Sequence, residues 1–181
     1  MQTNRITLAT VDVAVAWIGT GLGFAQAVFP PAGIKDQDVG APTLAGSYKM
    51  AGGKITIVGG GNDIWGNSDN FHFAYIPVTR DFDYVIKVED LRGPDNWSKA
   101  ELMAREGTDD GSGGLLLDGP DRHISTMTTR AGGQNEIALQ WRSDAPGSGS
   151  AWANDIGIST PVRRPTYPNT CLRLERFGSQ F

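Results

Sequence analysis

Apolar and polar residues alternate in short runs along most of this chain. Residues 54–58, Lys-Ile-Thr-Ile-Val, alternate and end at three glycines, and in residues 82–88 every second residue is apolar or aromatic. A period of two is typical of half-buried strands. Further runs of this kind, or short strand-like runs, occupy residues 47–50, 71–76, 99–105, 123–129, 136–142 and 172–177. Turn residues separate them, which predicts an all-β fold, a sandwich or barrel of antiparallel strands.

The run at residues 99–105 shows how such a strand divides its side chains. Ala100, Leu102 and Ala104 fall on one face, while Lys99, Glu101, Met103 and Arg105 fall on the other. No segment after the first 27 residues keeps a helical period. Residues 110–120 and 143–168 lack periodicity and are predicted to be loops.

The first 27 residues have a different character. One positive charge, Arg5, precedes the mostly apolar or small residues 8–24, and Ala25-Gln26-Ala27 matches a signal peptidase site. Asp12 within the apolar run argues against a membrane-spanning helix. We therefore predict a signal peptide at 1–27, with a membrane anchor or a buried helix as the alternatives. A linker at 28–40 and one β-domain at 41–181 follow, and the mature chain has no membrane span.

Composition narrows the possible functions. The chain has 24 glycines, 10 prolines and a charged fraction of 20%, which suits a fold with many tight turns. The net charge is −4 and there is no long basic run. Nucleic acid is therefore not an expected partner, because phosphate binding needs clustered Lys and Arg.

A series of motifs carries a resemblance to a known family. The motifs are 63–66 (Asp-Ile-Trp-Gly), 69–75, 81–83, 97–106, 122–123, 136–142 and 167–176. In this order they resemble the DUF1349-like modules of the concanavalin A-like lectin/glucanase superfamily, over about residues 38–181. The resemblance implies a two-sheet jelly roll, a secreted bacterial protein, and a domain cut short at its C-terminus. It also implies a module that binds a polysaccharide, a cell-surface glycan or another extracellular surface.

Catalytic signatures are absent from the sequence. Glucanases of this fold carry Glu-x-Asp-x-x-Glu on one strand, and no such spacing occurs; Glu101 and Glu106 differ by five residues and so fall on opposite faces. There is no Gly-x-Ser-x-Gly elbow, and His72 and His123 are the only histidines. We expect a non-catalytic protein, secreted or periplasmic or on the cell surface. The alternatives are a diverged glycoside hydrolase or lyase of the same fold, or a structural spacer.

Binding residues are predicted from aromatic and polar side chains in loops and at strand ends. Trp152, beside Asn154 and Asp155 in the long loop, is the tryptophan expected to be exposed for sugar stacking, and Arg105 and Arg142 could reach a ligand from strand ends. Trp65 and Trp97 are expected to be buried structural anchors.

Two acidic clusters suggest calcium, the one possible cofactor. Asp63 and Asp69 belong to one cluster, and Asp109 and Asp110 belong to the other. Neither follows the EF-hand spacing, and such residues also cap turns locally. The single cysteine, Cys171, lies in a predicted strand and is expected to be a buried or half-buried apolar residue.

Overall fold

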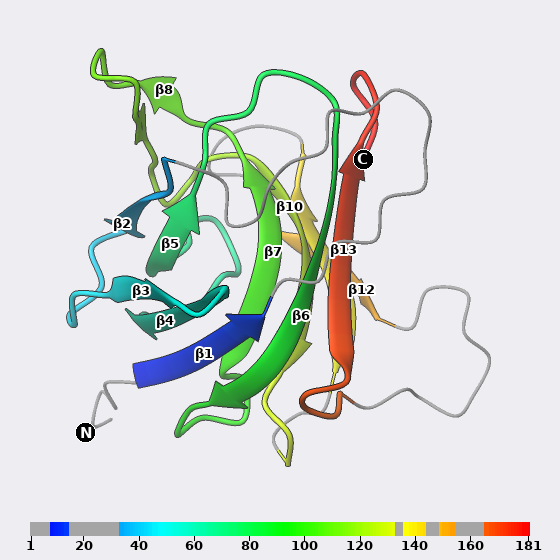
Figure 1. The fold of residues 1–181 in the computed structure, drawn as a ribbon. Helices are drawn as coiled ribbons and strands as arrows, with labels where there is room; N and C mark the ends of the chain where they lie inside the picture. Colours follow the sequence, from blue (N-terminus) through cyan, green and yellow to red (C-terminus); the bar gives the residue numbers. More distant parts are fainter. Residues whose placement is uncertain (1–7, 15–32, 133–135, 144–148, 155–164) are drawn as a thin grey trace.

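The computed structural model describes residues 8–14, 33–132, 136–143, 149–154 and 165–181. Every regular element in these ranges is a strand (Figure 1). The strands are β1 (Leu8–Ala14), β2 (Lys35–Val39), β3 (Ser47–Ala51), β4 (Lys54–Gly60), β5 (Phe71–Tyr75), β6 (Phe82–Arg92), β7 (Lys99–Arg105), β8 (Thr108–Asp109), β9 (Leu115–Leu116), β10 (His123–Thr129), β11 (Ile137–Arg142), β12 (Ala151–Asn154) and β13 (Thr170–Arg176).

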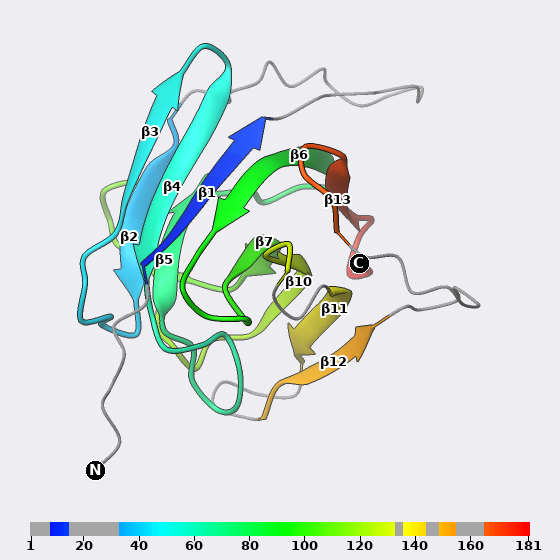
Figure 2. The same cartoon turned by 90° about the horizontal axis from the view of Figure 1, so that it is seen from below.

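Two large antiparallel sheets form the molecule. One has the order β13-β6-β1-β4-β3, and the other has the order β12-β11-β10-β7. They curve past each other as two layers (Figure 2). Small two-stranded sheets, β2-β5 and β8-β9, complete the fold. The predicted all-β, antiparallel β-sandwich is confirmed.

The hydrophobic core lies between the two large sheets. Val88 and Leu91 from β6, Leu172 from β13 and Ala100 from β7 form its buried centre. The partly buried residues that pack against it are Ile57, Ile86, Leu102, Ile137 and Tyr167. The strand period groups Ile86 with Val88 and Ala100 with Leu102 on one face of their strands, as found, because every second residue of a strand faces the opposite layer. Leu91 and Tyr167 lie outside the predicted runs.

Strand β13 shows the alternation most clearly. Leu172 and Leu174 are buried, while the residues between and beside them, Cys171 and Arg173, are exposed. The prediction of a buried or half-buried Cys171 is therefore wrong. Its neighbours are apolar, but its register in the strand places it on the outer face.

A register shift in β6 explains why Val88 and Leu91, three residues apart, are both in the core. Val13 pairs with Val88 and Asp12 pairs with Asp90, so Glu89 is the additional residue of a bulge. The bulge exchanges the two faces beyond it. Leu91 therefore points inward where an unbroken period of two would have placed Asp90.

Three segments differ from the sequence prediction. The structure places β1 inside the predicted signal peptide and β2 inside the predicted linker, and it places β12 inside the predicted long loop. Val39 at the end of β2 is fully buried, so the predicted linker overlaps the folded domain. β2 and β12 are short, with five and four residues, and β1 lies in the mostly apolar run predicted as a signal peptide. Their strand conformation depends on pairing with the partner strands β4, β5, β6 and β11.

A histidine ties the small β2-β5 sheet together. The His72 side chain on β5 is 2% exposed, and its Nδ1 lies 2.8 Å from Oδ1 of Asp38 on β2. Its Nε2 lies 3.2 Å from Asp36 Oδ2. A Cβ at Gly46 would lie 2.1 Å from the imidazole ring, so only glycine fits there. His72 is thus packed as a structural residue of this small sheet.

Candidate functional site

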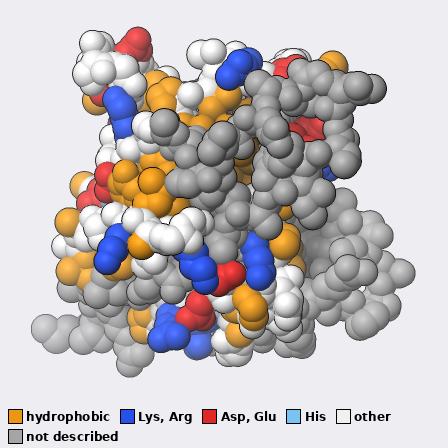
Figure 3. Space-filling view, in the orientation of Figure 1, with side chains coloured by type: hydrophobic (Ala, Val, Ile, Leu, Met, Phe, Trp, Pro, Cys, Tyr) orange, Lys and Arg blue, Asp and Glu red, His pale blue; other side chains and the backbone are white. Residues whose placement is uncertain are grey.

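A cleft of about 640 Å³ opens beside β4, β5 and β7. Its lining is mostly apolar, with Phe71, Phe73 and Met103 among its members, and it includes a few polar side chains. The Phe71 and Phe73 rings of β5, tilted against each other with centroids 5.6 Å apart, form part of its wall. Figure 3 shows hydrophobic side chains gathered over β5, with Lys and Arg side chains below them. This size and this mixed lining are typical of small-molecule sites.

Two tryptophans line the cleft, and both are exposed. Trp65 is 43% exposed and Trp97 is 41% exposed. The expectation that both are buried anchors is therefore wrong. Each lies in a loop, and the Lys99 ammonium group lies 5.9 Å from the centre of the Trp97 ring. Half-exposed indoles at a cleft can stack against a flat ligand.

Neighbouring hydrogen bonds hold the Trp97 loop in place. The Trp97 amide donates to Asp95 Oδ1 at 2.7 Å, and Arg130 Nε donates to the Asp95 carbonyl at 2.9 Å. A second Arg130 nitrogen donates to Asn96 Oδ1. The ring is thus presented by a loop that is fixed to the end of β10.

Polar groups gather near the tryptophans. The Lys99 side chain is 12% exposed, and its Nζ pairs with Asp63 Oδ1 at 2.6 Å, which joins β7 to the loop that carries Trp65. Gln140 Nε2 donates to the Ile64 carbonyl in the same loop. Asp63, Lys99 and Gln140 all line the cleft. They offer donors and acceptors close to an aromatic surface.

Glu101 is the most unusual group of the cleft. It projects from β7 on the face opposite to Ala100, and its Oε2 accepts a hydrogen bond from the Ser125 hydroxyl at 2.6 Å. Its Oε1 is buried and has no hydrogen-bond partner within the described part of the chain. Burial raises the pKa of Glu101 to about 7, against the opposing effects of Lys99 and of the Ser125 hydrogen bond. A carboxyl group in this state can donate or accept a proton near neutral pH.

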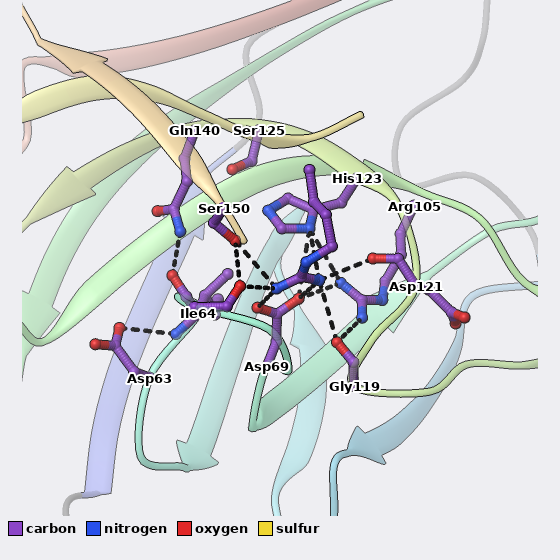
Figure 4. Close-up of polar contacts among 12 residues, drawn as sticks. Asp63, Ile64, Asp69, Arg105, Gly119, Asp121, His123, Ser125, Gln140 and Ser150 are labelled. Carbon is purple, nitrogen blue, oxygen red and sulfur yellow. Dashed lines mark hydrogen bonds and ion pairs between the residues drawn. The ribbon is translucent and has the colours of Figure 1, made fainter. Parts of the chain in front are cut away.

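A buried ionic cluster lies next to the cleft. The Asp69 carboxylate binds two guanidinium groups: Arg105 Nη1 lies 2.6 Å from Oδ2, and Arg142 Nη2 lies 2.7 Å from Oδ1 (Figure 4). All three side chains are 0% exposed. His123 Nδ1 lies 3.4 Å from Asp69 Oδ2. The cluster joins the loop after β4 to β7, β10 and β11.

Backbone carbonyl groups accept further hydrogen bonds from the two guanidinium groups of this cluster. Arg142 donates to the carbonyls of Gly66 and Asp121, and Arg105 donates to the carbonyl of Gly119 at 2.7 Å. Burial lowers the pKa of His123 to about 4, and although Asp69 opposes this, the two arginines add to it. The imidazole is therefore neutral at pH 7 and adds no third positive charge.

The cluster fixes the loop that carries Trp65. The Asp69 amide donates to the Gly119 carbonyl at 2.9 Å, and a Cβ at Gly119 would lie 2.2 Å from Ser68 Oγ. Glycine at 119 is thus required for this close approach. Ser150 Oγ and the Gly66 carbonyl both contact Arg142. The loops at 63–70, 118–121 and 149–150 are consequently held as one unit.

Arg105 and Arg142 do not occupy the positions expected of ligand-binding residues. Their guanidinium groups are buried against Asp69 and do not line the cleft. Of the other predicted binding residues, Trp152 and Asn154 lie on β12, which pairs with β11. Their side chains and Asp155 lie outside the described residues.

The four calcium candidates take up other contacts. Asp63 pairs with Lys99, and Asp69 pairs with the two arginines. Asp109 and Asp110 lie in the β8-β9 hairpin, where their carboxylates accept hydrogen bonds from backbone amides. Hydrogen bonds from Ser112 hold the pKa of Asp110 below its usual value. Among the residues that the structure describes, no group of three or more His, Cys, Asp or Glu side chains is placed to hold a metal ion.

The sequence pattern grouped some of the cleft residues but did not predict the cleft. Alternation placed Glu101 and Met103 on the same face of β7, but it did not show that both residues line a cleft. The exposure of Trp65 and Trp97 depends on where their loops fold back, and no local pattern encodes this.

Known proteins provide no further guide to the site. No family model, curated protein or solved structure matches the chain. Within the described ranges, no helix has the length and apolar character needed to cross a membrane.

Proposed function

We propose that this protein is a non-catalytic β-sandwich module that binds a carbohydrate in the cleft beside β5 and β7. The observation that carries the proposal is the pair of half-exposed tryptophans, Trp65 and Trp97, on a cleft that also holds charged and amide side chains. The apolar faces of sugar rings stack on indoles, and their hydroxyl groups need several donors and acceptors. Asp63, Lys99 and Gln140 supply these.

The wider context supports the same proposal. The resemblance to DUF1349-like modules of the concanavalin A-like superfamily implies a carbohydrate- or surface-associated role, and a β-sandwich is the architecture of that superfamily. The N-terminal segment suggests export, where polysaccharides and cell-surface glycans are the available ligands. Fold alone is weak support for function, so the cleft carries the argument.

Glycan-array binding with the full chain tests this proposal. Trp65→Ala and Trp97→Ala should each weaken binding of a glycan found on the array at least about tenfold, because aromatic anchors dominate such contacts. Phe177→Ala is the matched control, since Phe177 is 69% exposed and lies outside the cleft. It should bind as the unchanged protein does.

Two outcomes would contradict the proposal. One is the absence of binding to any glycan, which would favour a structural spacer. The other is binding that survives both tryptophan changes but is lost in Trp152→Ala, which would move the site to β12.

Glu101 favours a second candidate, a diverged glycoside hydrolase or lyase. A general acid needs a carboxyl group that is protonated near neutral pH, and Glu101 has this property within the cleft. Asp63 is a second carboxylate in the same cleft. Release of reducing or unsaturated sugars from polysaccharides, lost in Glu101→Gln, would establish this activity. Release that continues in the variant would exclude Glu101 as the acid.

A further inference from the structure

Strand β1 lies in the middle of the five-stranded sheet, although it comes from the start of the chain. It pairs along its whole length with β4, from Leu8 opposite Gly60 to Ala14 opposite Lys54. On its other side it pairs with β6, from Thr10 opposite Arg92 to Ala14 opposite Lys87. Figure 2 shows it between these two strands.

Strand β1 joins two halves of the sheet. In the sheet order, β3 and β4 lie on one side of β1, and β6 and β13 lie on the other. Neighbouring strands are about 4.8 Å apart, so β4 and β6 are separated by about twice that distance and cannot bond each other directly. Without β1, two facing rows of backbone N–H and C=O groups would lose their partners.

The gap between β4 and β6 is bordered by core residues. Val11 is in register with Ile57 on one side and with Leu91 on the other. Leu91 belongs to the buried centre of the core, and Ile57 packs against it. An empty gap would therefore expose these core residues to water and would also leave backbone hydrogen bonds unmade.

We propose that β4 and β6 form a strand-acceptor site, and that residues 8–14 are a strand ligand which this site binds even without a covalent connection. Main-chain hydrogen bonds on both sides supply the affinity, as in other cases where an extended peptide completes a sheet. The seven residues Leu-Ala-Thr-Val-Asp-Val-Ala are rich in small and β-branched side chains, which suit a strand in the interior of a sheet.

The proposal has a consequence for export. Cleavage after Ala27 would separate residues 8–14 from the rest of the domain and leave the acceptor site to retain that strand or bind another. The acceptor site uses backbone groups of β4 and β6, whereas the proposed carbohydrate contacts are made by side chains of Trp65 and Trp97; Ile57 of β4 and Ile86 of β6 also line the cleft.

Cleavage of the folded chain tests the proposal. A specific protease site replaces residues 24–30 in the full chain, and the folded protein is cut there. The N-terminal fragment should remain with residues 31–181 in gel filtration. An excess of a fluorescent peptide of residues 5–17 should then replace the N-terminal fragment on residues 31–181. The same peptide with Val11→Pro should not, because proline removes a ladder hydrogen bond within a sheet interior.

Each result decides the question. Departure of the fragment, with the remainder still folded and unable to bind the peptide, overturns the proposal. If the cut protein aggregates, prevention of aggregation by the unchanged peptide supports the proposal, and failure to prevent it overturns it.

Hydrogen exchange on the uncut chain provides a second test. Val11→Pro should increase amide exchange in β4 and β6 at least about tenfold while leaving β10 and β11 protected. Val11→Ala, which keeps the backbone N–H at the same position, is the matched control and should increase exchange far less. Unchanged protection of β4 and β6 in Val11→Pro would mean that residues 8–14 do not fill the gap. Complete unfolding of Val11→Pro, with Val11→Ala still folded, would support the proposal.

Discussion

At the scale of single residues, burial decides what each charge does. Asp69 and Asp83 are both paired with arginine, yet the Asp69 side chain is 0% exposed and the Asp83 side chain is 36% exposed. Water screens the Asp83 pair, so this pair contributes little to the stability of the protein. The Asp69 carboxylate, in contrast, lies between two buried guanidinium groups.

Replacement of the two aspartates should separate these cases. Asp69→Asn keeps the shape but leaves two buried positive charges uncompensated, so it should lower the free energy of unfolding by about 3–5 kcal/mol. The matched control Asp83→Asn should lower it by less than about 1 kcal/mol. Urea denaturation at pH 7 measures both. Equal losses would show that the Asp69 cluster is not buried.

Glu101 should make stability depend on pH. Its pKa is about 7 in the folded protein and about 4.5 when unfolded, so the folded state binds more protons between these values. Stability from this group therefore falls as pH rises from 4.5 to 7. Glu101→Gln removes the effect and should be more stable than the unchanged protein by about 3 kcal/mol at pH 8, with little difference at pH 4.

Denaturation of both proteins across this pH range measures the difference. His123, with its pKa lowered to about 4, acts in the opposite direction, since its contribution is lost as pH falls from 6.5 to 4. It is present in both proteins and cancels in the comparison. A difference that does not change with pH would contradict the burial of Glu101.

At the scale of elements, the strand period and its interruptions decide which residues form the core. β13 follows the period without a break, and β6 is interrupted by the bulge at Glu89. The period of residues 82–88 predicts Ile86 and Val88 on one face, as found, but the sequence does not predict the bulge that follows them. A bulge is a response to the partner strand β1, which the local pattern of β6 does not contain.

Adjacent residues of β13 should respond very differently to truncation. Leu172 is 2% exposed in the core, and Leu172→Ala should cost about 2–5 kcal/mol in free energy of unfolding. Cys171→Ala, one residue away on the outer face, should change it by less than about 0.5 kcal/mol. Thermal denaturation provides the comparison. A large effect of Cys171→Ala would show that the register of β13 is wrong.

At the scale of the whole molecule, some strands pack on the hydrophobic core and others do not. The core joins β6 and β13 to β7, while the β8-β9 hairpin is a separate two-stranded sheet whose β8 residues are exposed. Local stability follows buried apolar contact, so it should differ strongly between these regions.

Amide hydrogen exchange at the level of peptides should reveal this order. Amides of β6, β7, β10 and β13 should exchange slowest, and amides of residues 108–116 should exchange at least about a hundredfold faster. The physical reason is that the hairpin can open without exposing the core. Protection of the hairpin equal to that of β10 would contradict this account.

The alternation of apolar and polar residues was sufficient to predict the all-β class, the antiparallel sandwich and the inward faces of residues 82–88 and 99–105, because alternation is a local property and burial of one face follows from it. It placed residues 99–105 and 123–129 with the bounds of β7 and β10. Only the folded structure shows the cleft, the burial of Arg105 and Arg142 against Asp69, and the position of β1 between β4 and β6. These features join segments that are far apart along the chain, so each depends on where the other layer or strand lies, and no local pattern carries that information.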